Sequence, residues 1–74
     1  MRPSRQVTVR VDNPATASPQ ATLTDIKRWL AENKVTAVRV TPIVDALGYA
    51  FLVVFDSEEA AEYFRVEFLG QRLD

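Results

Sequence analysis

Apolar and polar residues alternate along several short stretches of the chain. This period of two is typical of β-strands with one buried face. It predicts three strands, at residues 6–11, 37–43 and 49–55. In the first, Val7, Val9 and Val11 are expected to point inward. Pro42 cannot donate a ladder hydrogen bond, so the second strand is expected at a sheet edge.

Helical spacing replaces the alternation between the first two strands. Leu23, Ile26 and Leu30 recur on one helical face. Thr22 is a predicted N-cap, and Asn33 is a predicted end of this helix.

A second helix is predicted after the third strand. Asp56 or Ser57 is expected to cap it, and acidic residues fill its first turn, where the helix dipole favours them. Its predicted buried stripe is Ala60, Ala61, Phe64 and Phe68, and Gly70 is expected to close it.

The order strand, helix, strand, strand, helix predicts an α+β fold. We expect an incomplete ferredoxin-like sandwich (βαββα), with a three-stranded antiparallel sheet of order 1-3-2 and both helices on one face. The remaining segment, "GQRLD", is short and polar, so no fourth strand is expected and the first strand should keep an open edge. Residues 1–74 form one domain, with a flexible arm at 1–5 and a long proline-containing loop at 12–21.

Composition favours a small globular domain and excludes several chemistries. The chain has 74 residues, of which 47% are hydrophobic and 26% charged. It has no cysteine and no histidine, so we expect no disulfide, no metal site and no cofactor. No apolar run is long enough to cross a membrane, and no apolar signal segment follows the N-terminal arginines, so a cytoplasmic location is expected.

Charge is unevenly distributed although the net charge is only −1. Arginines without acids occupy residues 1–11, whereas acids dominate residues 56–74. A protein dedicated to double-stranded DNA would be clearly basic overall, so this partner is not expected.

The stretch from Leu47 to Val54 resembles the third-strand octamer of the RNA-recognition motif (RRM) family. Gly48-Tyr49-Ala50-Phe51-Leu52 fits the middle five positions of that octamer. The segment Val9–Pro14 is similar to the family's first-strand hexamer in two aliphatic residues and Asn13. The resemblance implies a ferredoxin-like sheet that binds single-stranded RNA by stacking bases on Tyr49 and Phe51.

Alternation also predicts which side of the sheet is open. If Ala50, Leu52 and Val54 face the helices, the opposite side chains of the third strand form an uncovered stripe. Polar residues of the other strands would join that stripe. The predicted binding face consists of Tyr49, Phe51, Val53, Phe55, Arg10, Arg39, Thr8 and Thr41.

Four interpretations of this face remain open. The leading one is a non-catalytic module for protein association, as a homodimer or with a docking partner, through the face and the first-strand edge. Single-stranded RNA binding is the alternative. A small acidic inhibitor whose second helix mimics nucleic-acid phosphates is a further alternative, and a second buried layer under the chain's own loops is the last.

Catalysis is not expected. Ser57 has no histidine to activate it and occupies a helix-cap position. Glu58, Glu59 and Glu62 are typical of a solvated first turn, so we interpret them as structural.

Overall fold

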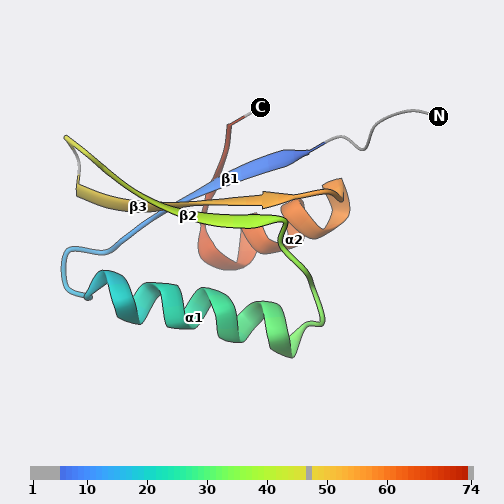
Figure 1. Ribbon diagram of the computed structural model, residues 1–74, viewed down its shortest axis with the longest axis horizontal. Helices are drawn as coiled ribbons and strands as arrows, with labels where there is room; N and C mark the ends of the chain where they lie inside the picture. Colours follow the sequence, from blue (N-terminus) through green and yellow to red (C-terminus); the bar gives the residue numbers. More distant parts are fainter. Residues whose placement is uncertain (1–5, 47, 74) are drawn as a thin grey trace.

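The chain folds into an α+β domain with six elements (Figure 1). The computed structural model describes residues 6–46 and 48–73. The predicted arm at 1–5 and the octamer position Leu47 lie outside these residues. In chain order the elements are β1 (Val7–Asp12), α1 (Pro19–Glu32), β2 (Arg39–Asp45), β3 (Gly48–Phe55), α2 (Glu58–Phe68) and β4 (Gln71–Arg72).

The sheet has four strands in the order β2-β3-β1-β4. The third strand does lie between the first and second, and Pro42 does lie on an edge strand. The predicted three-stranded sheet and open first-strand edge are wrong, because Gln71 and Arg72 pair with β1. The pairing uses backbone groups, so the polar side chains that argued against a fourth strand do not prevent it.

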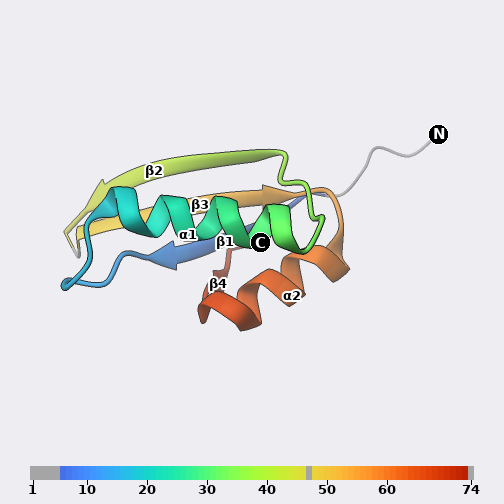
Figure 2. The same cartoon turned by 90° about the horizontal axis from the view of Figure 1, so that it is seen from below.

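Both helices cover the same face of the sheet (Figure 2). The core lies between them and the sheet, and it includes Ile26 of α1 and Ala61 and Phe64 of α2. Each large apolar side chain buried here contributes about 1.5–3 kcal/mol.

The predicted facing of β3 is wrong along the whole strand, and three residues show this most clearly. Phe51, Val53 and Phe55 belong to the core on the helix side, and Phe51 is only 2% exposed. The cause is the pairing of β3 with β1, in which Val11, Val9 and Val7 stand directly opposite these three residues. Opposite residues share a face. The inward valines of β1, which were predicted correctly, therefore fix the two phenylalanines inward as well.

Helix α1 begins earlier than predicted. Ser18 is its N-cap and accepts a hydrogen bond from the backbone N–H of Ala21 at 3.1 Å. Pro19 suits the first helical turn because it has no N–H to satisfy. Thr22, the predicted cap, is instead buried inside the helix. The connection from β1 therefore covers only residues 13–18.

Helix α2 is close to its prediction. Ser57 caps it and accepts from the backbone N–H of Ala60 at 3.2 Å. The Phe64 ring lies 5.4 Å from Trp29 and 5.2 Å from Phe55, measured between ring centroids, so it joins α1, α2 and β3. The helix ends at Leu69, which adopts the left-handed conformation.

Candidate functional site

The candidate site is the face of the sheet that carries no helix. Alternation and register place Thr8, Arg10 and Asp12 of β1 on this face, opposite Val54, Leu52 and Ala50 of β3. From β2 it receives Arg39, Thr41, Ile43 and Asp45. The predicted site residues Arg10, Arg39, Thr8 and Thr41 are thus brought together, whereas Tyr49, Phe51, Val53 and Phe55 lie on the other side.

An arginine crosses the middle of this face. Arg10 Nε donates to Asp12 Oδ1 at 2.8 Å, and its Nη2 donates to Asp45 Oδ2 at 2.7 Å. Since β3 lies between β1 and β2, the side chain must pass over β3. Ala50, which pairs with Asp12, is fully buried there although no helix covers that side. We call this arrangement of Arg10, Asp12 and Asp45 the Arg10 strap.

The Arg10 strap is a partly buried ion pair. The Arg10 side chain is 18% exposed, and its hydrogen bonds to Asp12 and Asp45 raise the pKa of the guanidinium above its ordinary value. The strap therefore holds a fixed positive charge between two carboxylates. It also joins the first strand to the end of β2.

Charge is polarised along the strand direction on this face. Asp45 ends β2 and Asp12 ends β1, and these two strands run parallel because both pair antiparallel with β3. Arg39 begins β2 and so lies at the opposite end, where it makes no ion pair with any residue in the described ranges. Leu52 and Ile43 lie half-buried between the two ends.

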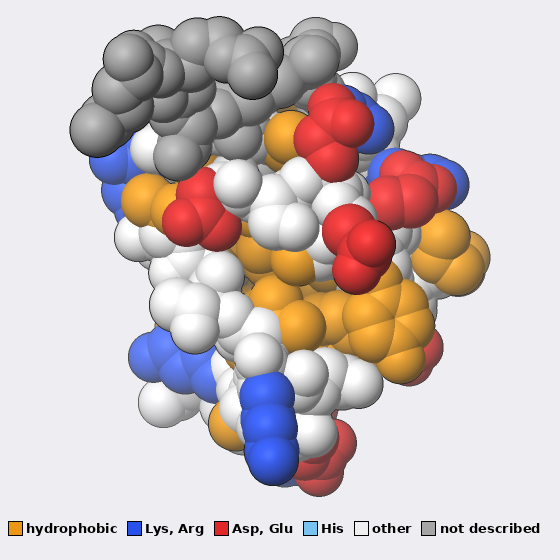
Figure 3. All heavy atoms as spheres, turned by 90° about the vertical axis from the view of Figure 1, so that its right-hand side faces the viewer, with side chains coloured by type: hydrophobic (Ala, Val, Ile, Leu, Met, Phe, Trp, Pro, Cys, Tyr) orange, Lys and Arg blue, Asp and Glu red, His pale blue; other side chains and the backbone are white. Residues whose placement is uncertain are grey.

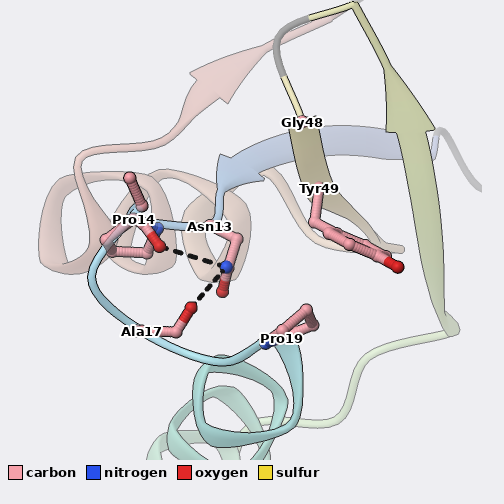
Figure 4. A pocket seen from close by; sticks show the side chains of 7 residues that line it. Asn13, Pro14, Ala17, Pro19, Gly48 and Tyr49 are labelled. Atoms are coloured by element: carbon pink, nitrogen blue, oxygen red, sulfur yellow. Dashed lines mark hydrogen bonds between the residues drawn. The ribbon is translucent and has the colours of Figure 1, made fainter.

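Tyr49 lies at the rim of a hollow on the helix side. This hollow of about 350 Å³ is formed by the β1–α1 connection and the start of β3 (Figure 4). Its loop is organised by Asn13, whose Nδ2 donates to the backbone oxygens of Pro14 at 3.1 Å and Ala17 at 2.9 Å. The Thr22 hydroxyl donates to Asn13 Oδ1. The sequence pattern did not indicate this role of Asn13, although an Asn in a proline-containing loop is a common turn-forming residue.

A second hollow, of about 410 Å³, separates the end of α1 from the start of α2. Val35, Ala60 and Tyr63 supply its apolar lining. Figure 3 shows this end of the molecule, where apolar side chains gather in the centre and acidic side chains surround much of them.

Two of the acids on α2 are paired with arginines. Glu58 Oε1 accepts from Arg72 at 2.7 Å, and Glu62 Oε2 accepts from Arg65 at 2.5 Å. The hydrogen bond from Arg65 lowers the pKa of Glu62 below its ordinary value. This pairing reduces the free negative charge with which α2 could imitate phosphates.

The described residues contain no group of three or more potential metal-ligating side chains. Neither helix in this part of the chain has the length and apolar character needed to cross a membrane. Comparison of the chain with protein-family models, with curated proteins and with solved structures found no match.

Proposed function

We propose that this protein is a non-catalytic module that binds another protein through the helix-free face of its sheet. The observation that carries the proposal is the one-sided sheet. Both helices cover one face, while Leu52 and Ile43 of the other face lie under no described helix. Apolar side chains on an uncovered sheet favour association, because contact with a partner removes them from water.

The strand edges support binding through the face rather than by strand addition. On β1, Arg10 pairs with Gln71, and the Thr8 carbonyl accepts from the Leu73 backbone N–H at 3.0 Å. On β2, Pro42 interrupts the row of donors that an added strand would need. The open first-strand edge expected from the sequence therefore has no part in this proposal.

Single-stranded RNA is a weaker candidate for the same face. Among the described residues, the strand positions on this face carry no aromatic ring on which a base could stack. Arg39 could contact a phosphate, but base stacking supplies much of the affinity of such surfaces. Protein association needs no ring at this position.

Crosslinking in cells tests the proposal. A photoreactive amino acid replaces Thr41, on the helix-free face, and in a control it replaces Lys27, which is exposed on α1. We expect a discrete protein adduct from position 41 that is absent from position 27. The double substitution Leu52→Gln with Ile43→Gln should remove this adduct, whereas Val66→Gln on α2 should retain it. An RNA adduct at position 41, or equal adducts at both positions, would contradict the proposal.

A further inference from the structure

We infer that the partner is a second copy of this chain, packed face to face about a two-fold axis that runs perpendicular to the strands. The inference rests on the proposed function and names the occupant of its face. The observation behind it is the polarised charge of that face.

The two charged ends of β2 are complementary under this symmetry. Arg39 and Asp45 are the first and last residues of the strand and point to the same side of the sheet. A two-fold axis lying between two stacked faces, perpendicular to the strands, reverses the strand direction. It therefore lays β2 of one copy antiparallel over β2 of the other. Arg39 of each copy then faces Asp45 of its partner, and the contact occurs twice, as an isologous interface requires.

Beside the Arg10 strap, the same arrangement also brings apolar side chains together. The axis passes between the row of Leu52 and Thr41 and the row of Ala50 and Ile43. The two-fold thus brings Leu52 of one copy beside Ile43 of the other, and both side chains are half-buried in the single chain. Stacked sheets lie about 10 Å apart with interdigitating side chains, and half-buried Leu and Ile side chains can fill that layer.

The Arg10 strap is compatible with this interface. Asp45 Oδ2 accepts from Arg10 of the same chain at 2.7 Å. An ionised carboxylate offers about four acceptor sites on two oxygens, so Asp45 can share a further guanidinium with the contacts that it makes within its own chain.

The charges of the described residues favour this axis over the other simple two-fold. An axis parallel to the strands would exchange the two edges of the sheet, so that β2 of one copy lies over β4 of the other. Arg39 would then face the neighbourhood of Leu73, which follows β4 beside Thr8 and carries no charge. Among the described residues, the perpendicular axis pairs Arg39 with a carboxylate and the parallel axis does not.

Sedimentation velocity of the purified protein, from micromolar to millimolar concentration, tests this inference. We expect a reversible monomer–dimer equilibrium. Arg39→Asp and Asp45→Arg should each raise the dimer dissociation constant about tenfold or more, because each places like charges opposite one another. Lys27→Asp on α1 changes the charge by the same amount as Arg39→Asp and should leave the equilibrium unchanged.

A mixture of the Arg39→Asp and Asp45→Arg variants provides the decisive experiment. In a mixed dimer, the new carboxylate of one chain meets the new guanidinium of the other, and the native pair remains at the opposite end. Equimolar mixing should therefore restore the dimerisation that each variant alone has weakened.

A wild-type protein that stays monomeric at millimolar concentration would overturn the inference. So would a dimer that is insensitive to Arg39→Asp. If the protein does not dimerise but crosslinks from position 41 to a different protein, the proposed function stands and only the dimer is excluded. If it neither dimerises nor forms a protein crosslink from position 41, the proposed function is excluded as well.

Discussion

At the end of α2, the left-handed backbone conformation and the close approach to β1 occur at two neighbouring residues, Leu69 and Gly70. Leu69 has a left-handed backbone with φ of 53°, and its side chain is 91% exposed. The Gly70 N–H donates to the Arg65 carbonyl at 2.8 Å, as in a Schellman motif. A Cβ on Gly70 would lie 2.7 Å from Val9 Cγ1 and 2.9 Å from the Arg10 carbonyl oxygen. Position 70 therefore needs glycine for the close approach to β1. The left-handed conformation, which is strained for a residue with a side chain, is adopted by Leu69.

Substitutions at these two positions should have opposite effects. Gly70→Ala should lower the free energy of unfolding by about 1–3 kcal/mol, because Val9 and the β1 backbone must move to admit the methyl group. Leu69→Gly should raise it by up to about 1 kcal/mol, because glycine adopts positive φ without steric cost. Urea unfolding followed by circular dichroism measures both changes. A neutral Gly70→Ala variant would show that β4 does not require this approach.

At the level of single elements, β2 is the strand most open to unwanted pairing. The Asn13 N–H donates to the Tyr49 carbonyl at 2.9 Å, so the odd-numbered residues of β3 direct their backbone groups toward β1. The even-numbered residues then bond to β2, and Val40, Pro42 and Val44 direct their backbone groups outward. Pro42 stands in the middle of this free edge and removes its central donor.

Pro42→Thr should therefore promote aggregation. The substitution restores an N–H at the centre of an edge flanked by Val40 and by Val44, which is 68% exposed. We expect faster growth of light scattering at millimolar concentration, with the monomer fold unchanged by circular dichroism. Thr41→Val, one residue away on the helix-free face, adds apolar surface without adding a donor and serves as the control. If the two variants scatter light equally, added apolar surface and not the restored N–H on the β2 edge would explain the aggregation.

The elements themselves were largely predictable from the sequence, whereas two features of their assembly were not. Alternation located β1, β2 and β3, and Ser57 was one of the two residues predicted as the cap of α2. The start of α1 was missed because Thr22 is also an acceptable cap residue. The sequence does carry a signal for the observed start, since Ser18 is followed by Pro19, which suits the first helical turn. The fourth strand was missed because its pairing depends on a backbone approach at Gly70, which residue polarity does not report.

At the scale of the whole molecule, the main hydrophobic cluster lies on one side of the sheet, and this determines which aromatic residues support the fold. Phe51 and Phe55 are 2% and 0% exposed and lie with Phe64 between the sheet and the helices. A chain of 74 residues has a total stability of roughly 4–11 kcal/mol. One of these rings therefore accounts for a large share of it.

Phe51→Ala should come close to unfolding the protein. We expect a loss of about 3–5 kcal/mol from the missing apolar contacts and the cavity left behind. Leu52→Ala, the next residue on the helix-free face, should cost about 1 kcal/mol, since Leu52 is only half-buried. Thermal and urea unfolding at micromolar concentration compare the two. A larger loss from Leu52→Ala would mean that the facing of β3 is opposite to that described.

The candidate site was only half predictable for the same reason. Arg10 and Arg39 were assigned to the helix-free face because they alternate with inward valines of their own strands. The aromatic residues of β3 were assigned there by independent reasoning from β3 alone. A sequence does not state the register between two strands, and the register of β1 with β3 decides the question.

The pairing of the strands also implies an order of assembly during folding. Asp45 pairs with Gly48, so β2 and β3 meet across a short connection and can find each other quickly. β1 must reach β3 across α1 and β2, and β4 must reach β1 from near the other end of the chain. Contacts between distant segments slow folding, because loop closure must precede any gain from pairing. From this connectivity we expect the β2–β3 hairpin to form first and β4 to join the sheet last.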